Sequence, residues 1–248
     1  MKKIKNFFLD LFLPRQCIGC KTNDTWLCKS CFKLIKPNSK QVCYICRKNS
    51  YFGQTCASHL NSLRKLNRLL VAAHYSANPV LKDAIHALKY QRHPEDIADK
   101  LGQLLLQTLQ SNLTEPANSI EIIPIPLHKK RLKERGFNQA ELIAQSLSSP
   151  PTPNSHRTDV LPKRLYPTLN TQLLTRSRYT TSQVQNKSRE NRLENLKEAF
   201  SLSQKPNPRI IYLLIDDVAT TGSTLEECCQ ILKENEAQEV WGLVVARN

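Results

Sequence analysis

Paired cysteines near the start of the chain place the strongest constraint on its fold. Seven of the nine cysteines lie between Cys17 and Cys56, in three Cys-x2-Cys pairs and one Cys-x2-His pair. A pair with this spacing directs two ligand atoms at one ion, and two pairs complete the tetrahedral shell of a structural zinc site. We therefore expect two zinc ions to hold this segment. The predicted ligands are Cys17, Cys20, Cys28, Cys31, Cys43, Cys46, Cys56 and His59.

The spacing leaves the assignment of ligands to the two sites open. Sequential pairing gives the four cysteines up to Cys31 to one ion and the remaining four ligands to the other, whereas a crossed arrangement alternates the pairs. We favour sequential pairing. His59 is the weakest member, because an ordinary surface histidine there would leave a three-cysteine set. A disulfide scaffold is disfavoured, because seven cysteines leave one unpaired and nothing in the sequence indicates an oxidising compartment.

The charge of the chain favours polyanionic partners. The formal net charge is +15, and residues 1–68 hold fourteen Lys or Arg against two acidic residues. Nucleic acid, acidic lipid and phosphorylated small molecules all suit such a charge. Aromatic residues in this segment either stack on unpaired bases or form its small core. They are Trp26, Phe32, Tyr44, Tyr51 and Phe52.

The sequence predicts a protein that acts in the cytoplasm. No run of eighteen apolar residues occurs, so we expect no membrane span. Residues 1–14 have a basic start and a short apolar stretch, but Asp10 interrupts it and no small-residue cleavage site follows. We therefore interpret this stretch as a short amphipathic helix and not as a secretory signal.

After the cysteines the chain alternates between apolar runs and helical periodicity. Apolar runs at 66–76, 119–127 and 209–217 predict strands, and residues 79–90, 97–109, 136–147 and 225–235 have helical spacing. Alternating strands and helices indicate an α/β fold with a parallel sheet covered on both faces. Residues 148–169 contain five prolines and no periodicity, so they predict an irregular insertion of unknown role.

The stretch LLIDDVATTGSTL, residues 213–225, joins a strand to a helix at the carboxyl edge of this sheet, where open α/β sheets bind ligands. Free backbone N–H groups at a helix start favour phosphate, and Gly222 lets the anion approach closely. Two carboxylates directly before such a turn suit a sugar diol, with Mg²⁺ as a bridge. The residue types therefore describe a holder for ribose 5-phosphate.

This stretch resembles the signature of type I phosphoribosyltransferases. The resemblance implies that Asp216 and Asp217 bind the ribose hydroxyls of phosphoribosyl pyrophosphate, together with Mg²⁺. The 5-phosphate would bind Thr220, Thr221, Gly222, Ser223 and Thr224.

A second resemblance narrows the family. The stretches PIPLHKKRLKERGFNQAELIA (124–144), IHALKY (85–90) and TTSQVQNKSRENRLENLKEAF (180–200) are similar to the ComF family, competence-linked proteins with a phosphoribosyltransferase-like domain. The resemblance implies a zinc-ribbon module at 1–68 and a phosphoribosyltransferase-like domain at 69–248. It also implies a mobile loop that closes over the substrate, at 175–189, and a pyrophosphate loop. The loop residues are Pro126, Leu127, His128 and Lys129.

Two functions are compatible with this resemblance. The favoured one is a protein of DNA uptake in natural competence, with a phosphoribosyl pyrophosphate site and a basic zinc module that handles single-stranded DNA beside other competence proteins. The alternative is a metabolic phosphoribosyltransferase that acts on an unidentified nitrogen nucleophile. No residue is recognisable as a general base, so the sequence leaves open whether transfer occurs.

Overall fold

The computed structural model describes residues 15–61, 64–91, 93–113, 120–148, 167–176 and 199–247. The predicted amphipathic helix at 1–14 lies outside these residues. So do most of the insertion at 148–169 and all but the first two residues of the predicted mobile loop. No helix within the described ranges is both long and apolar enough to cross a membrane.

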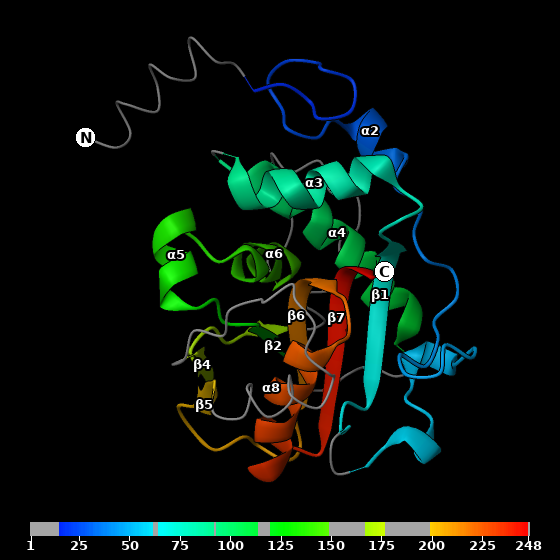
Figure 1. Ribbon diagram of the computed structural model, residues 1–248, viewed down its shortest axis with the longest axis vertical. Coiled ribbons are helices and arrows are strands. Elements are labelled where there is room, and N and C mark those ends of the chain that lie inside the picture. Colours follow the sequence, from blue (N-terminus) through cyan, green and yellow to red (C-terminus); the bar gives the residue numbers. More distant parts are fainter. Residues whose placement is uncertain are drawn as a thin grey trace, which may run out of the picture.

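A five-stranded sheet forms the centre of the molecule (Figure 1). Every neighbouring pair in it is parallel, which confirms the predicted α/β class. The order across the sheet is β1 (Arg68–His74), β7 (Glu239–Arg247), β6 (Ile211–Ala219), β2 (Ile120–Pro124) and β3 (Thr168–Leu169).

Helices cover both faces of the sheet. On one face lie α3 (Pro79–Tyr90), α4 (Glu95–Asn112) and α6 (Gln139–Ser148), and α8 (Ser223–Glu234) lies on the other (Figure 1). Successive side chains of β6 explain this division, because neighbours in a strand point to opposite faces. Leu213 and Ile215 join the core that includes α3, α4 and α6, whereas Tyr212 and Leu214 join the core that includes α8.

Short elements complete the described fold. They are α2 (Lys29–Lys33), the 3-10 turns η1 (Tyr51–Gly53) and η2 (Ala57–His59), α5 (Lys129–Arg135), and the antiparallel pair β4 (Leu174–Arg176) and β5 (Phe200–Leu202).

The start of α6 differs from the sequence prediction. We expected a helix from Gly136, but α6 begins at Gln139 and Gly136 instead ends α5, with a left-handed φ of 83°. Glycine adopts this conformation without strain, so it terminates helices more often than it starts them. The effect is a sharp turn that joins α5 to α6.

The cysteine-rich segment packs on the rest of the chain along its length. Asn38 donates its backbone N–H to the Ala72 carbonyl at 2.7 Å, and the Gln41 side chain bonds both backbone groups of Val71 at 3.0 and 3.1 Å. Asp96, at the start of α4, accepts hydrogen bonds from the Thr25 hydroxyl and the Trp26 amide. The division into domains at residues 68 and 69 stays a prediction.

Candidate functional site

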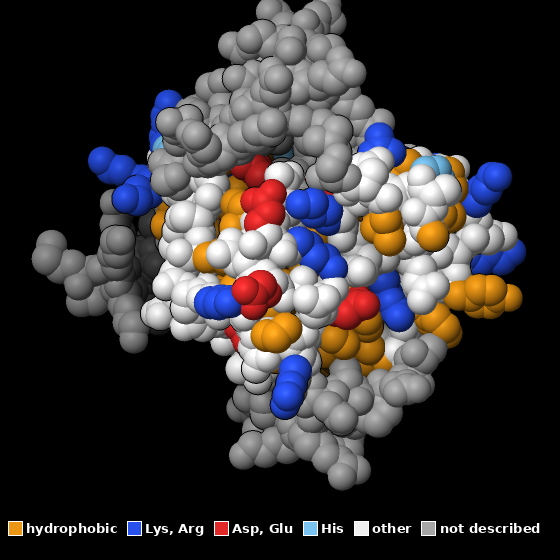
Figure 2. All heavy atoms as spheres, turned by 90° about the horizontal axis from the view of Figure 1, so that it is seen from below, with side chains coloured by type: hydrophobic (Ala, Val, Ile, Leu, Met, Phe, Trp, Pro, Cys, Tyr) orange, Lys and Arg blue, Asp and Glu red, His pale blue; other side chains and the backbone are white. Residues whose placement is uncertain are grey.

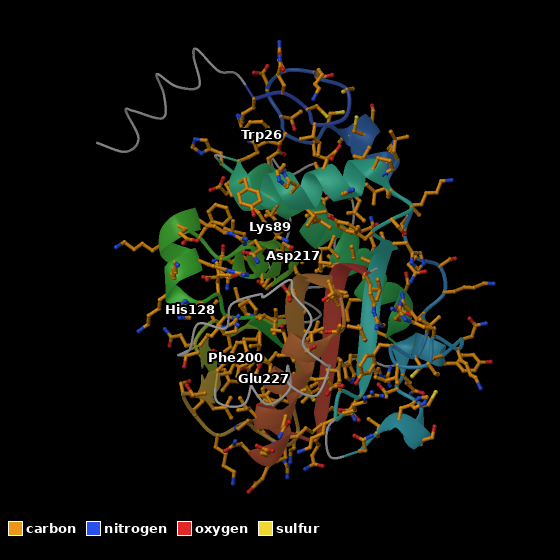
Figure 3. The ribbon with its side chains drawn as sticks, in the orientation of Figure 1. Trp26, Lys89, His128, Phe200, Asp217 and Glu227 are labelled. Carbon is orange, nitrogen blue, oxygen red and sulfur yellow. The ribbon has the colours of Figure 1, made fainter. Side chains whose placement is uncertain are left out.

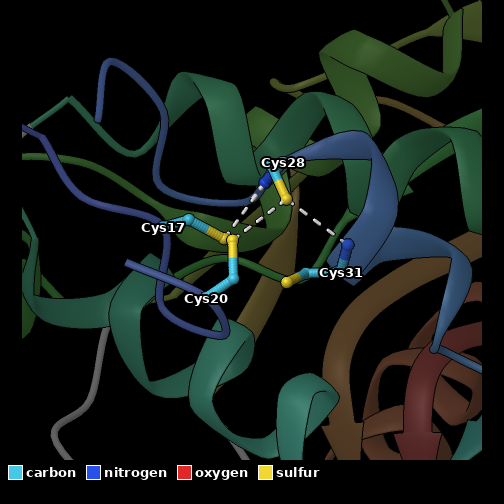
Figure 4. Close-up of side chains that lie close together, drawn as sticks. All are labelled: Cys17, Cys20, Cys28 and Cys31. Atoms are coloured by element: carbon cyan, nitrogen blue, oxygen red, sulfur yellow. Dashed lines mark hydrogen bonds between the residues drawn. The ribbon is translucent and has the colours of Figure 1, made fainter. Parts of the chain in front are cut away.

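The structure gathers the eight predicted metal ligands into two groups. Cys17, Cys20, Cys28 and Cys31 form the first group (Figure 4), which we call group 1, and Cys43, Cys46, Cys56 and His59 form group 2. Within each group the ligand atoms all lie within 4.8 Å of one another. This is the sequential arrangement.

The distances inside the groups fit a tetrahedral zinc shell. Zn–S bonds of about 2.3 Å place two sulfur ligands roughly 3.8 Å apart. The Sγ atoms of Cys20 and Cys28 are 3.5 Å apart, and those of Cys46 and Cys56 are 3.9 Å apart. His59 presents Nδ1 to the Cys43 sulfur at 3.6 Å, so its ring faces the group. The residues therefore fit two structural zinc ions.

The first cysteine pair of each group has the same backbone geometry. Lys21 and Arg47 directly follow these pairs with φ near +63°, and their amides donate to the Cys17 and Cys43 carbonyls at 2.9 Å. A left-handed residue here reverses the chain so that both sulfurs of a pair face one point. The two groups are thus built on a repeated hairpin.

Asp216 and Asp217 lie inside strand β6 and not after it. The parallel register continues beyond them, from Val218 with Ala246 to Ala219 with Arg247. Because neighbours in a strand point to opposite faces, the two carboxylates separate: Asp217 faces α3 and α6, and Asp216 faces α8 and β4. The sequence analysis treated them as one pair and missed this separation.

Asp217 is almost fully buried, with 4% of its surface exposed, and it has two side-chain partners. Lys89 of α3 forms an ion pair with Asp217 Oδ2 at 2.5 Å (Figure 3), and Gln139 Nε2 donates to Oδ1 at 3.4 Å. Arg135 in turn donates to Gln139 Oε1 at 2.9 Å. These contacts bring together residues of the IHALKY, RGFNQ and LLIDD stretches.

Asp216 has a different environment. Burial and the neighbouring charge of Asp217 raise the pKa of the Asp216 carboxyl well above its ordinary value. Its Oδ1 accepts the Asp217 amide at 2.8 Å. On the same side, Arg176 at the end of β4 lies close enough for its charge to interact with Asp216 and Glu227. Burial lowers the pKa of the Arg176 guanidinium, and the two carboxylates act in the opposite direction.

The turn between β6 and α8 is open to solvent. Thr220 and Thr221 are exposed, and Gly222 adopts a left-handed φ of 80° just before α8. The Thr221 and Ser223 hydroxyls are hydrogen-bonded to each other. Within the described ranges, the amides of Thr221 and Gly222 have no hydrogen-bond acceptor. The turn therefore offers free donors at a helix start, which suit an anion.

The ring of Tyr44 lies close to this turn. It lies inside the first cysteine pair of group 2, and a Cβ atom on Gly222 would meet its ring at 3.8 Å. Arg247 Nη2 donates to the Tyr44 carbonyl at 2.6 Å. The Tyr44 hydroxyl is buried and has no hydrogen-bond partner among the described residues. The first cysteine pair of group 2 therefore lies close to the turn.

The predicted pyrophosphate loop leads from β2 into α5. His128 caps α5 by accepting the Lys130 amide on Nδ1 at 3.1 Å. Burial and the positive charges of Arg176, Arg131, Lys129 and Lys130 lower the pKa of the His128 imidazole. The loop and β4 therefore share a cationic environment that suits an anion.

The comparisons with known proteins identify the family. The chain is 34% identical over 246 residues to Competence protein F of Haemophilus influenzae. The aligned residues cover 95% of this chain and 99% of that protein. The chain belongs to the ComF family. It is also 32% identical over 237 residues to DNA utilization protein YhgH of Escherichia coli strain K12, covering 88% of this chain and 95% of that protein.

A more distant relative supports the same membership in the ComF family. Competence protein ComFC of Bacillus subtilis is 26% identical over 231 residues, which cover 91% of this chain and 85% of that protein. No protein-family model matches the chain.

Lys89 and Gln139 were not assigned a site role from the sequence of this ComF-family chain, whereas Arg176 was placed in the mobile loop and Tyr44 among the aromatic residues of the cysteine-rich segment. In the structure, Lys89, Gln139 and Arg176 contact or face the two carboxylates, and the Tyr44 ring lies close to the turn. IHALKY and RGFNQ stood out in the sequence as family stretches. Their convergence on Asp217 was not visible, because it joins segments far apart in the chain.

Proposed function

We propose that the chain binds phosphoribosyl pyrophosphate with Mg²⁺ and acts in the uptake and use of DNA. The open turn at the end of β6 carries the first part of this proposal. Its free amides and hydroxyls follow two carboxylates within a parallel sheet, and open α/β sheets bind ligands at this edge. The second part rests on relatives whose names are Competence protein F and DNA utilization protein YhgH.

Each end of the ligand has its own group of residues in this proposal. The 5-phosphate binds Thr220 to Thr224, where the amides of Thr221 and Gly222 have no acceptor among the described residues. Asp216 and Asp217 bind the ribose hydroxyls, and Lys89 pairs with Asp217 from α3. The loop from Pro126 to Lys129 binds the pyrophosphate. Mg²⁺ would neutralise charge between the ligand and the carboxylates.

We propose zinc as the ion of both cysteine groups. Four thiolates in group 1, and three thiolates with one imidazole in group 2, are closed ligand sets that leave no position for a substrate. Each ion would therefore hold the backbone in place and take no part in chemistry. Because the Tyr44 ring lies close to Gly222, the group 2 ion would also hold the backbone beside the turn.

Single-stranded DNA is the proposed macromolecular partner. Lys29, Lys33 and Lys36 are exposed on and just after α2, where their charges can meet phosphates. On the face in Figure 2, at the amino ends of the strands, the visible basic side chains alternate with acidic ones. That face of the described residues offers no continuous basic patch, so α2 and the opposite edge are better candidates.

A thermal-shift titration tests the ligand site. Phosphoribosyl pyrophosphate with Mg²⁺ should raise the melting temperature of the native chain, because a ligand that binds only the folded state stabilises it. Thr221→Val removes an exposed hydroxyl of the turn and should reduce this shift, whereas Thr171→Val, at an equally exposed threonine outside the site, should not. An equal shift in all three proteins would contradict the proposed position of the 5-phosphate.

A further inference from the structure

An open cleft lies beside the carboxylate network, between the end of α3 and helix α5. Its volume is about 500 Å³, within the range of roughly 300 to 1,000 Å³ that small-molecule sites occupy. Neither the phosphate turn nor the predicted pyrophosphate loop lines it. The lining residues are Lys89, Tyr90, Gln91, Arg131, Glu134, Arg135 and Phe137.

The charge of the cleft suits a single phosphodiester. Lys89, Arg131 and Arg135 bring three positive charges, and Glu134 in the lining and Asp217 behind Lys89 bring two negative ones. The balance of +1 matches one backbone phosphate. It is too small for a pyrophosphate group, which carries several negative charges and needs more cations around it.

The cleft also presents planar groups to a ligand. The Tyr90 side chain is 65% exposed, although it is large and aromatic. The Arg135 guanidinium lies 5.5 Å from its ring centroid, and the His86 ring centroid is 4.8 Å from it. Unpaired bases stack on such aromatic and guanidinium surfaces regardless of their sequence.

We infer that this cleft binds one nucleotide of single-stranded DNA, with the base against Tyr90 and its phosphate against Arg131 and Arg135. The inference rests on the proposed use of single-stranded DNA and gives that partner a place outside the cysteine-rich segment. Arg135 reaches Asp217 through Gln139, so the bound nucleotide lies next to the proposed ribose site.

Binding of an end-labelled oligothymidylate to the zinc-loaded full chain, followed by fluorescence anisotropy, tests the inference. Tyr90→Ala should weaken binding by roughly five- to one-hundred-fold, because one base loses its stacking surface. Tyr90→Phe should bind like the native chain. Leu132→Ala is the matched control, since Leu132 is 41% exposed on α5 but does not line the cleft, and it should change affinity by less than about twofold.

The phosphate contact has its own readout. Arg131→Gln should lower the slope of binding against salt concentration by about one, while Lys133→Gln, on the same helix but outside the cleft, should leave the slope unchanged. Native affinity in Tyr90→Ala, equal losses in Tyr90→Ala and Leu132→Ala, or no binding by the native chain would each overturn the inference.

Failure of the cleft and failure of the ligand site can be told apart. Tyr90→Ala should keep the native thermal shift with phosphoribosyl pyrophosphate, because Tyr90 does not contact the turn or the carboxylates. If that shift persists while the oligonucleotide fails to bind, the DNA cleft is wrong and the phosphoribosyl site stands. A different result would identify the cleft as a pyrophosphate subsite and show that the inference is wrong. In that case inorganic pyrophosphate alone binds in the cleft, and Tyr90→Ala leaves the affinity for the oligonucleotide unchanged.

Discussion

At the scale of single residues, the buried carboxylate of Glu226 lies in an unusual electrostatic environment close to the proposed site. Glu226, in the first turn of α8, has only 7% of its surface exposed. Its Oε2 accepts the Lys65 and Leu66 amides at 2.9 and 3.3 Å, which ties α8 to the segment before β1. Burial nevertheless raises the pKa of Glu226 from its ordinary 4.5 to about 7, since the two hydrogen bonds only partly offset the lost hydration.

This raised pKa predicts a pH dependence of stability. The unfolded state ionises near pH 4.5 and the folded state near pH 7, so between these values the folded state binds more protons and its stability falls as the pH rises. Between pH 6 and 8 Glu226 should cost on the order of 1 kcal/mol of unfolding free energy. The free energy of unfolding, measured with urea for the native chain and for Glu226→Gln, should decrease less steeply with rising pH in the variant.

Glu227 provides the control for that measurement. Burial also raises its pKa to about 7, but its carboxylate faces Arg176 and not the segment before β1. Its contribution is present in both the native chain and Glu226→Gln, so the difference between the two proteins isolates Glu226. Parallel pH profiles for the two proteins would show that Glu226 ionises normally in the fold.

Elements and their connections show what the sequence could and could not predict. The three predicted strands and the helix after LLIDD are present, because apolar runs and helical spacing are local signals. The ligand pairs likewise follow from local spacing, whereas their sequential grouping was favoured from the sequence and is established by the structure. The ion pair of Lys89 with Asp217 and the approach of Tyr44 to Gly222 join segments more than a hundred residues apart, and no local pattern encodes them.

The position of Tyr44 between two group 2 ligands and close to the turn predicts that metal binding supports ligand binding. Cys46→Ser should lose the group 2 ion and weaken the binding of phosphoribosyl pyrophosphate by about tenfold or more, because Tyr44 would no longer be held against Gly222. Cys20→Ser in group 1 is the matched control. It should lose one zinc per chain as well but retain more of the affinity.

Zinc content and ligand titration must be measured on the same samples. Tyr44→Ala should reproduce the loss of affinity with both ions in place, and Tyr44→Phe, which keeps the ring, should retain most of the affinity. Equal affinity in Cys46→Ser and Cys20→Ser, with one zinc lost from each, would show that group 2 has no special role at the turn.

At the scale of the whole molecule, one sheet edge organises the proposed chemistry. Strand β6 separates two carboxylates to opposite faces, and each face then recruits its own cation, Lys89 from α3 and Arg176 from β4. The cysteine-rich segment extends the fold to this edge, because Tyr44 is part of it. The proposed chemistry therefore depends on the turn after β6 holding a phosphorylated pentose.

Equilibrium titration of the native chain with phosphoribosyl pyrophosphate, in buffers with and without Mg²⁺, tests that claim most directly. We expect saturable binding at one site per chain that strengthens with Mg²⁺ and with rising pH, since the Asp216 carboxyl, whose pKa is raised, must lose its proton to bind a cation. Asp216→Asn should abolish the gain from Mg²⁺. Heat changes on titration that do not exceed the heat of dilution would contradict the proposed site. So would an affinity that changes neither with Mg²⁺ nor in Asp216→Asn.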